Sequence, residues 1–402
     1  SCFNGLGQLD TTCSSIITLD TLRVDGNPAI ASLDDLKYFD QLKYLEVGFT
    51  NLVSVQHLPN TLETLIFDDP LSQLSSFTLP PNLKKFVLRG CENMHYVPPA
   101  WPSTLQYLDL TGCAYTSITN LPSSLDTLKI SGQVNINGLT VPAGNTYPSL
   151  ISLALPANLR YLDCSRNGLT TLNDIPNSLT WLDCSQQYSV VDDPVTFAYK
   201  QIPKLQQIDH LSPQLEELYC YSNALTSLPA LPPTLRVLSA FYNKYNISFA
   251  YFDGSSVSFS NPGIATVPDF PSTLTTIRLN INNISCLPYI PASVTNFYIN
   301  QNPLNCLPNS LPGGLVNTDA AAIPLCNAIN NSYQCERHPI LAGTLFYDNN
   351  LNGTQDLGEL PRANVRVQLE TGLSTFTNNN GQYEISADIG AHTLTFDAPP
   401  FY

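Results

Sequence analysis

Apolar residues recur along most of the chain in the frame Leu-x-x-Leu-x-Leu, where x is mostly polar. Leu105, Leu108 and Leu110 form one copy, and the frame returns at Leu125, twenty residues later. Alternating apolar and polar positions predict a short strand with one buried face and one exposed face. Twelve copies begin at Leu19, Leu42, Leu62, Leu83, Leu105, Leu125, Leu159, Leu179, Leu215, Leu235, Leu274 and Val294.

The distance between copies predicts how the strands are connected. Most successive copies start 20 to 23 residues apart, which suits one turn of a coil with a strand and a short return segment. A single coil cannot bury its own leucines, so neighbouring coils stack and their strands pair in parallel. Three longer intervals, 125–159, 179–215 and 235–274, predict loops that bulge from the coil.

Two further positions recur from repeat to repeat beside the frame, and we call each of them a column. An Asn stands three residues after it in six copies, where its side chain can bond to backbone groups as the chain leaves the sheet. An apolar-Pro pair stands ahead of it, as Leu58-Pro59 does before Leu62, and we expect these prolines in an extended return segment. The Asn column comprises Asn27, Asn167, Asn223, Asn243, Asn282 and Asn302.

These columns together closely resemble the leucine-rich-repeat family, and the short L-P-x-x-L repeats look most like its bacterial members. The resemblance covers residues 19–315 and implies a right-handed solenoid of parallel β-strands. The ends of a repeat array need caps. We therefore expect an N-terminal cap over 1–18 and a C-terminal cap over 316–337.

The leucine periodicity stops near Cys335 and gives way to an alternation of period two. Segments 365–369, 383–385 and 393–396 alternate in this way and predict strands. Among them, residues 348–359 place oxygen-bearing side chains at positions 1, 3, 5, 9 and 12 of a loop, with Gly353 at position 6. This spacing is the calcium-loop pattern, because Ca²⁺ takes six to eight oxygen ligands. A polar turn without a metal is the alternative. The predicted ligands are Asp348, Asn350, Asn352, the carbonyl of Thr354, Asp356 and Glu359.

Residues 338–402 also resemble the Cna-B/SdrD-B β-repeats of bacterial surface adhesins. Segments 343–348, 365–369 and 377–383 carry this resemblance, together with the calcium loop. It implies a seven-stranded antiparallel β-sandwich that serves as a spacer. Some relatives form Lys–Asn crosslinks, but residues 338–402 contain no Lys, so we expect none here. The chain stops just after a predicted strand, and we expect the natural protein to continue.

The 11 cysteines fall into two groups. Those beside the predicted caps are expected to form disulfides, with the pairing left open. Those inside the repeats are expected to be small buried thiols, although neighbouring coils also lie within disulfide reach. No C-x-x-C pair suggests zinc. The disulfide candidates are Cys2, Cys13, Cys286, Cys306, Cys326 and Cys335; the expected buried thiols are Cys91, Cys113, Cys164, Cys184 and Cys220.

Composition and motifs restrict the function. A net charge of −15 with only 17 Lys and Arg argues against a nucleic-acid partner, which needs clustered cations. The five His residues are dispersed, and no nucleophile elbow or phosphate loop is present, so we expect no enzyme. No apolar run is long enough to predict a transmembrane segment. Because the sequence opens at Ser1-Cys2, we expect a mature exported chain whose signal peptide has been removed.

The polar positions of the frame face outward on the concave side of the predicted sheet. In the middle of the array they repeatedly pair an aromatic with an acid, and exposed aromatics supply binding energy in many interfaces. The aromatic pair Tyr161 and Trp181 suits sugar stacking or a peptide. Asp163 and Asp183 are expected on neighbouring strands, where Arg160 or another cation would relieve their repulsion. Strand propensity alone is the alternative reason for the aromatics. The candidate ligand residues are Tyr107, Asp109, Tyr161, Asp163, Trp181, Asp183 and Tyr219.

Together these features predict a non-enzymatic adhesion or ligand-binding protein on a bacterial cell surface, with calcium as its cofactor. The combination of repeats and adhesin-type module resembles exported Bacteroidota proteins, many of which use type IX secretion, some in gliding motility. The expected partner is a protein or glycan ligand. Two alternatives remain: a structural partner or cargo of an outer-membrane secretion complex, and a polysaccharide-binding accessory protein.

Overall fold

The computed structural model describes most of the chain. The described residues are 10, 12–24, 26, 30, 32–48, 52, 54–68, 76–90, 100–113, 115–132, 150–192, 199–250, 255–326, 329–335, 340–370, 374–386 and 391–397. They divide into two units: Ser1–Ala224 with Asn246–Ser260, and Leu225–Tyr245 with Asn261–Tyr402. Each unit is considered by itself.

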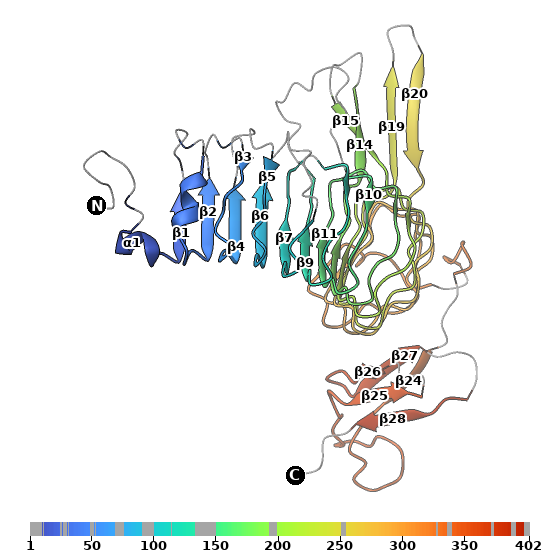
Figure 1. Cartoon of the computed structure of the whole chain (residues 1–402). Coiled ribbons are helices and arrows are strands. Elements are labelled where there is room, and N and C mark those ends of the chain that lie inside the picture. The colour runs from blue at the N-terminus through green and yellow to red at the C-terminus, as the bar shows by residue number, and fades with distance from the viewer. Residues whose placement is uncertain are drawn as a thin grey trace. The chain divides into compact units, whose positions relative to one another are not determined.

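The first unit is a parallel β-solenoid (Figure 1). Each coil contributes one short strand to its main sheet, and every strand begins two residues after a frame leucine. The order in space follows the order in sequence. The strands are β1 (Thr21–Val24), β2 (Tyr44–Gly48), β4 (Thr64–Asp68), β6 (Lys85–Arg89), β7 (Tyr107–Asp109), β9 (Thr127–Lys129), β11 (Tyr161–Asp163), β13 (Trp181–Asp183) and β17 (Glu217–Tyr219).

The frame leucines form the core of the coil. Leu108, Leu128, Leu162, Leu182 and Leu218 are paired along the sheet and are fully buried. Each buried leucine contributes about 1.5–3 kcal/mol relative to exposure, and no coil can bury its leucines without a neighbour. The parallel solenoid predicted from the frame is therefore present.

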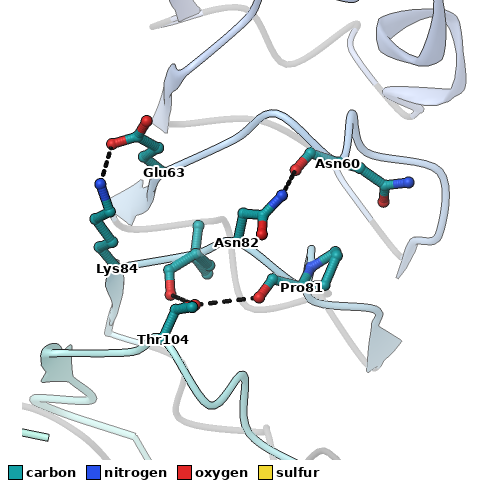
Figure 2. A network of polar contacts seen from close by, with 7 residues as sticks. Asn60, Glu63, Pro81, Asn82, Lys84 and Thr104 are labelled. Carbon is teal, nitrogen blue, oxygen red and sulfur yellow. Dashed lines mark hydrogen bonds and ion pairs between the residues drawn. The ribbon is translucent and has the colours of Figure 1, made fainter. Parts of the chain in front are cut away.

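Polar side chains tie each coil to the coil before it (Figure 2). Lys84 donates to Glu63 at 2.7 Å, and the amide of Asn82 donates to the carbonyl of Asn60 at 3.0 Å. The hydroxyl of Thr104 donates to the carbonyl of Pro81 at 3.1 Å. These bonds join residues one repeat apart, so they fix the stacking of neighbouring coils.

The Asn column satisfies the backbone where the chain leaves the sheet, as the sequence predicted. The amide nitrogen of Asn167 donates to the carbonyls of Ile130, Cys164 and Ser165, and its oxygen accepts from the amide of Leu150. Asn223, Asn243, Asn282 and Asn302 make matching bonds to their own coils.

The prolines of the return segments stand at the first position of tight turns that lead into the strands. The carbonyl of Pro59 accepts from the amide of Leu62 at 3.2 Å, which makes Pro59 the first residue of a tight turn. Pro102 and Leu105 repeat the arrangement at 3.1 Å. A proline suits this position because its carbonyl is used and its missing N–H is not needed.

The outer side of the coil carries short paired strands and inserted hairpins. The long interval 179–215 holds an antiparallel hairpin, as expected for a bulging loop, and Figure 1 shows it extending from the coil. The paired short strands are β3 (Ser54–Val55) with β5 (Ser76–Phe77), β8 (Ser117–Ile118) with β10 (Ser152–Leu153), and β12 (Thr171–Leu172) with β16 (Gln207–Ile208). The hairpin is β14 (Tyr188–Asp192) with β15 (Tyr199–Pro203), and the interval 235–274 holds β19 (Tyr245–Ala250) with β20 (Ser256–Asn261). Two short helices, α1 (Ser14–Ile17) and η1 (Asp34–Tyr38), precede β2.

The second unit contains further coils of the same kind. Its main-sheet strands are β18 (Val237–Ser239), β21 (Thr276–Arg278), β22 (Asn296–Tyr298) and β23 (Asn317–Thr318). The strand β23 lies inside the segment expected as a C-terminal cap and pairs in parallel with β22. The repeat frame did not reveal it, because Thr318 stands where the second leucine of the frame would be.

The second unit also contains two small antiparallel sheets. One pairs β24 (Ile340–Thr344) with β27 (Gln382–Ser386), and the other has the order β26 (Ser374–Phe376), β25 (Arg366–Leu369), β28 (Leu394–Asp397). Side chains from both sheets form one cluster around Leu369 and Ile385, with Leu341 and Leu394 packed against it. The strands expected from the alternating pattern are therefore present. Among the described residues, no helix is long and apolar enough to cross a membrane.

Candidate functional site

The outward-facing side chains of the main sheet form two rows in the first unit. The parallel register aligns equivalent frame positions of neighbouring strands, so each row runs across the sheet at right angles to the strands. Along β7, β9, β11, β13 and β17, the first row is Tyr107, Thr127, Tyr161, Trp181 and Glu217, and the second row is Asp109, Lys129, Asp163, Asp183 and Tyr219. All seven candidate ligand residues lie in these rows.

The aromatic side chains of these rows, together with Lys129, form a continuous series of contacts. The rings of Tyr161 and Trp181 stack with centroids 4.1 Å apart and planes at 4°, and Trp181 meets Tyr219 at 5.4 Å and 42°. The ammonium of Lys129 lies 5.3 Å from the ring centre of Tyr161 and 5.9 Å from that of Tyr107. We call Tyr107, Lys129, Tyr161, Trp181 and Tyr219 the aromatic ladder.

Glu217 fixes one end of the aromatic ladder. Its Oε2 accepts from the indole Nε1 of Trp181 at 3.1 Å and from the hydroxyl of Tyr219 at 2.8 Å. A carboxylate that accepts two such bonds holds both rings in place, because charge-assisted hydrogen bonds are stronger than neutral ones. The aromatic ladder is thus preorganised before any ligand arrives.

The acids of the second row have different surroundings. Asp109 is buried and its Oδ2 accepts from Nε and Nη2 of Arg89 at 3.0 and 2.7 Å. Asp163 and Asp183 stand directly opposite each other in the register of β11 and β13. Arg160, which the sequence suggested as their counter-ion, instead lies 3.7 Å from Asp126. Asp163 and Asp183 form no ion pair within the described part of the chain.

Asp163 and Asp183 each accept hydrogen bonds from a serine two residues later in the chain. The Oδ1 of Asp163 accepts from the amide and the hydroxyl of Ser165 at 3.1 and 2.7 Å. The Oδ1 of Asp183 accepts from the amide of Ser185 at 2.9 Å. Burial raises the pKa of Asp183 above its ordinary value, and the charge of Asp163 adds to this, while interactions with Ser185 act in the opposite direction.

The same surroundings shift the pKa of Tyr161. Burial raises the pKa of its hydroxyl to about 12, and the charges of Asp163 and Asp183 contribute to the increase. A phenol beside two carboxylates stays protonated, because a third negative charge there would be unfavourable. Negative potential is therefore concentrated where β11 and β13 lie side by side.

The cations of this face were not predicted from the sequence. The ammonium of Lys85, on the strand before Tyr107, lies 4.8 Å from the centre of the Tyr107 ring, and Lys129 is on the strand after it. Arg89 neutralises Asp109. The signal was present, because Lys85 and Lys129 occupy the same frame positions as the aromatics and acids. The face is therefore basic around Tyr107 and acidic around Trp181.

The predicted calcium loop folds around its own carboxylates. Oδ1 and Oδ2 of Asp348 accept from the amides of Asn352 and Gly353 at 3.1 and 2.7 Å. The two oxygens of Glu359 accept from the amides of Asn349 and Asp356 at 2.8 and 3.0 Å. Gly353 has φ = +78°, the left-handed conformation that favours glycine at the turn.

The donors of this loop are hard oxygens that suit calcium. The amides of Asn350 and Asn352 both reach Oδ2 of Asp356 at 2.7 Å, so their side chains converge on one carboxylate. Among the described residues, no three His, Cys, Asp or Glu side chains form a metal-binding group. A calcium ion here would therefore depend on amide and carbonyl oxygens as well as on carboxylates, as the predicted ligand set does.

Disulfides are present at the C-terminal end of the repeats. Cys286 bonds to Cys335 and Cys306 bonds to Cys326. Cys13 is disulfide-bonded, while Cys2 and Cys91 lie outside the described residues. Cys164, Cys184 and Cys220 are buried thiols, and burial raises their pKa. The sulfur of Cys113 lies 3.2 Å from the carbonyl of Leu88, where an Asn of the column would donate.

Comparisons with known proteins identify structural neighbours only. No protein-family profile matches the chain, and no curated protein does. YopM from Yersinia enterocolitica is 23% identical, with 69% of this chain and 60% of that chain covered and a TM-score of 0.43. YopM from Yersinia pestis, a leucine-rich effector protein, is 22% identical over 69% of this chain and 77% of its own, with a TM-score of 0.42. A leucine-rich-repeat protein of Leptospira interrogans is 16% identical over 71% of this chain and 85% of its own, with a TM-score of 0.31.

The chain spans less than two thirds of the Yersinia enterocolitica protein. These neighbours are leucine-rich-repeat proteins. The solenoid of this chain is established by its own register and buried frame leucines.

Proposed function

We propose that this chain is a non-enzymatic binding protein that holds a protein ligand on the outward face of its main sheet, at the aromatic ladder. The observation that supports this most is the continuous contact of Tyr107, Lys129, Tyr161, Trp181 and Tyr219 across five neighbouring strands. A preorganised row of large aromatic side chains binds with little loss of conformational entropy.

The arrangement of the rings favours a protein over a polysaccharide. Sugar stacking needs an open ring face, but the faces of Tyr161 and Trp181 cover each other at 4.1 Å. Trp181 also contacts the ring of Tyr219 at 5.4 Å, and Lys129 lies over Tyr161. The ladder therefore presents ring edges beside charged groups, a surface that suits the mixed polar and apolar side chains of a protein.

Export to a bacterial cell surface is part of the same proposal. The disulfides Cys286–Cys335 and Cys306–Cys326 support it, because such bonds persist in oxidising compartments. The two small antiparallel sheets at the C-terminal end support an adhesin-type β-sandwich as a spacer. Adhesion is the role that this combination suits best.

Binding to arrays of surface proteins and glycans tests the proposal. The double variant Tyr161→Ala/Trp181→Ala should lose at least tenfold in affinity for any ligand of the wild type. Tyr44→Ala is the matched control, because Tyr44 belongs to the same row but lies outside the ladder. Equal binding by wild type and double variant would place the ligand elsewhere, and binding to glycans alone would favour the polysaccharide alternative.

We also propose that the loop 348–359 binds calcium. The spacing of Asp348, Asp356 and Glu359 in the loop, their bonds to amides of the same loop and the turn at Gly353 support this. Millimolar CaCl₂ should raise the melting temperature of the C-terminal sheets by several degrees, by mass action. Asp348→Asn and Glu359→Gln should abolish the increase, whereas Asp397→Asn, an acid on β28 of the same sheets, should retain it. An unchanged melting temperature in calcium would contradict the assignment.

A further inference from the structure

The hairpin of β19 and β20 has a strand edge that no other strand covers in the described part of the chain. The two strands form a sheet of their own, and each is six residues long. A ribbon of only two strands is marginally stable by itself, because the outer edge of each strand presents backbone N–H and C=O groups to solvent. Such an edge is a template on which a further strand can pair.

The open edge belongs to β20. On β19, the carbonyl of Ser248 accepts from the Nζ of Lys200, a residue of β15, at 3.2 Å. Figure 1 agrees with this contact, since β19 lies between the hairpin β14–β15 and β20. On β20, no described backbone group outside the hairpin bonds to Ser256, Ser258 or Ser260, and all three are exposed.

The strand β20 also lacks the features that keep strand edges from pairing. Natural edge strands carry charged side chains or proline for this purpose. The hairpin β14–β15 has both, because Asp192, Lys200 and Pro203 lie on its strands. Neither β19 nor β20 contains a charged residue or a proline. In a chain with a net charge of −15, this uncharged edge is a place where two copies can approach each other without local repulsion.

The sequence of β20 is complementary to itself in an antiparallel pair. With Ser258 on a two-fold axis, Val257 lies opposite Phe259 of the partner subunit, and Ser256 lies opposite Ser260 of the partner subunit. Pairs of a β-branched and an aromatic residue stabilise neighbouring strands, as do pairs of hydroxyl residues. A shift of one residue would place serines opposite the apolar residues and lose this match.

We propose that β20 is a dimerisation edge, at which two copies of this chain pair antiparallel through residues 256–260 and form a four-stranded sheet. A symmetric contact of this kind uses the same surface of both copies, so association stops at two. The contact is small, and small interfaces give weak and reversible association. A dimer carries two aromatic ladders, so it holds a surface with repeated ligands more tightly than one chain does.

Sedimentation velocity of the full chain over a hundredfold range of concentration tests the proposal. The mean mass should rise from that of one chain toward that of two and should not exceed two. Ser258→Lys places like charges opposite each other on the two-fold axis, so it should raise the dissociation constant about tenfold or more. Asn246→Lys is the matched control, because it adds the same charge at an exposed position of β19 and should dimerise as the wild type does. Thermal melts verify that both variants fold.

Single cysteines test the register. Ser258→Cys should form a covalent dimer under a mild oxidant, since the Cα atoms of opposite residues lie about 4.5–5.5 Å apart, within disulfide reach. Ser256→Cys should not bond to its own copy, because four residues of strand, about 13 Å, separate the two sites. It should instead form a mixed dimer with Ser260→Cys. The wild type under the same oxidant is the control for the cysteines already in the chain.

The outcomes separate this inference from the proposed function. A mass of one chain at every concentration would overturn the dimer. A dimer that Ser258→Lys leaves equally tight would overturn it too, because the contact would then lie elsewhere. Equal crosslinking of Ser256→Cys and Ser258→Cys, each alone, would overturn the pairing about Ser258. The double variant Tyr161→Ala/Trp181→Ala should dimerise as the wild type does, so loss of ligand binding and loss of the dimer are distinguishable.

Discussion

Asp109 and Asp183 occupy equivalent positions in their repeats and have opposite surroundings. Both stand in the second outward-facing row, on β7 and β13. Asp109 is 1% exposed and accepts two hydrogen bonds from Arg89. Asp183 is half-buried, faces Asp163 across the register and has no ion pair among the described residues. One acid is neutralised by an arginine of the fold, and the other faces a second acid.

The difference originates in one column of the repeat. Arg89 stands six residues after its frame leucine Leu83 and reaches the acid on the next strand. The equivalent residue before Asp183 is Ser165, six residues after Leu159. Serine carries no charge that could neutralise Asp183, and the hydroxyl of Ser165 donates to Asp163 instead. A single repeat position therefore decides whether the acid on the next strand has an internal counter-ion.

Removing the internal cation should have the largest effect. Arg89→Met would leave Asp109 buried without a counter-charge, which costs about 3 kcal/mol of unfolding free energy. Urea denaturation measures this loss. The double variant Arg89→Met/Asp109→Leu should recover most of it, because no buried charge is left. A loss below about 1 kcal/mol in the single variant would show that Asp109 is adequately solvated.

Disrupting the aromatic ladder should have the next largest effect. Tyr161→Ala removes the ring stacked on Trp181, and we expect a loss of about 1–2 kcal/mol. The change also opens Asp183 to water, so the pKa of Asp183 should move toward its ordinary value. Chemical denaturation and carboxyl NMR titration measure the two effects. An unchanged Asp183 titration would mean that the ring does not shield it.

Neutralising the unpaired acid should stabilise the protein. Asp183→Asn removes the repulsion with Asp163, and we expect a gain of about 1 kcal/mol at pH 7. The folded-state pKa of Asp183 is raised, so the wild type loses stability as pH rises from the ordinary Asp value through that pKa. Tyr219 on β17 is its register partner. The charged and titratable groups that interact with it are Asp163, Arg166, Tyr161 and the thiols of Cys164, Cys184 and Cys220.

The gain from Asp183→Asn should therefore appear over that interval and stay constant above it. Thermal melts from pH 3 to pH 7 measure the profile, and Asp209→Asn is the control for net charge. A variant less stable than the wild type at pH 7 would show that Asp183 has an internal partner and would weaken the comparison with Asp109.

The exposed ion pair should show the smallest effect. Arg160→Met breaks the contact with Asp126 at 3.7 Å, in which both side chains are about half exposed or more. Exposed pairs of this kind contribute little, so the loss should be below about 0.5 kcal/mol. Urea denaturation at low and high salt measures it. A loss comparable to that of Arg89→Met would mean that burial is not what distinguishes the two pairs.

Sequence periodicity was sufficient to predict the coil and the location of the candidate face. Frame leucines repeat because every coil has the same core, and the rows follow directly from the frame. The ring stack of Tyr161 on Trp181 was not predictable, since it depends on side-chain rotamers. The pairing of Arg160 with Asp126 was missed because Arg160 stands one residue outside the strand.

The C-terminal end was less predictable for a physical reason. In the described part of the chain β23 ends the main sheet, and Thr318 stands at its second frame position in place of a leucine, so the frame did not mark this strand. The disulfide partners of Cys286 and Cys306 were open, since the spacing of cysteines does not determine which coils face each other. Both questions depend on tertiary contacts that no local pattern encodes.

The two disulfides are nested, since Cys306–Cys326 lies within the segment closed by Cys286–Cys335. Tension applied from the chain beyond Cys335 would pass through a covalent bond directly to Cys286. The residues between these two cysteines would carry none of that load, including those that form β22 and β23. Mechanical strain would thus bypass the last coils, and a tethered molecule would resist pulling at the repeats ahead of Cys286.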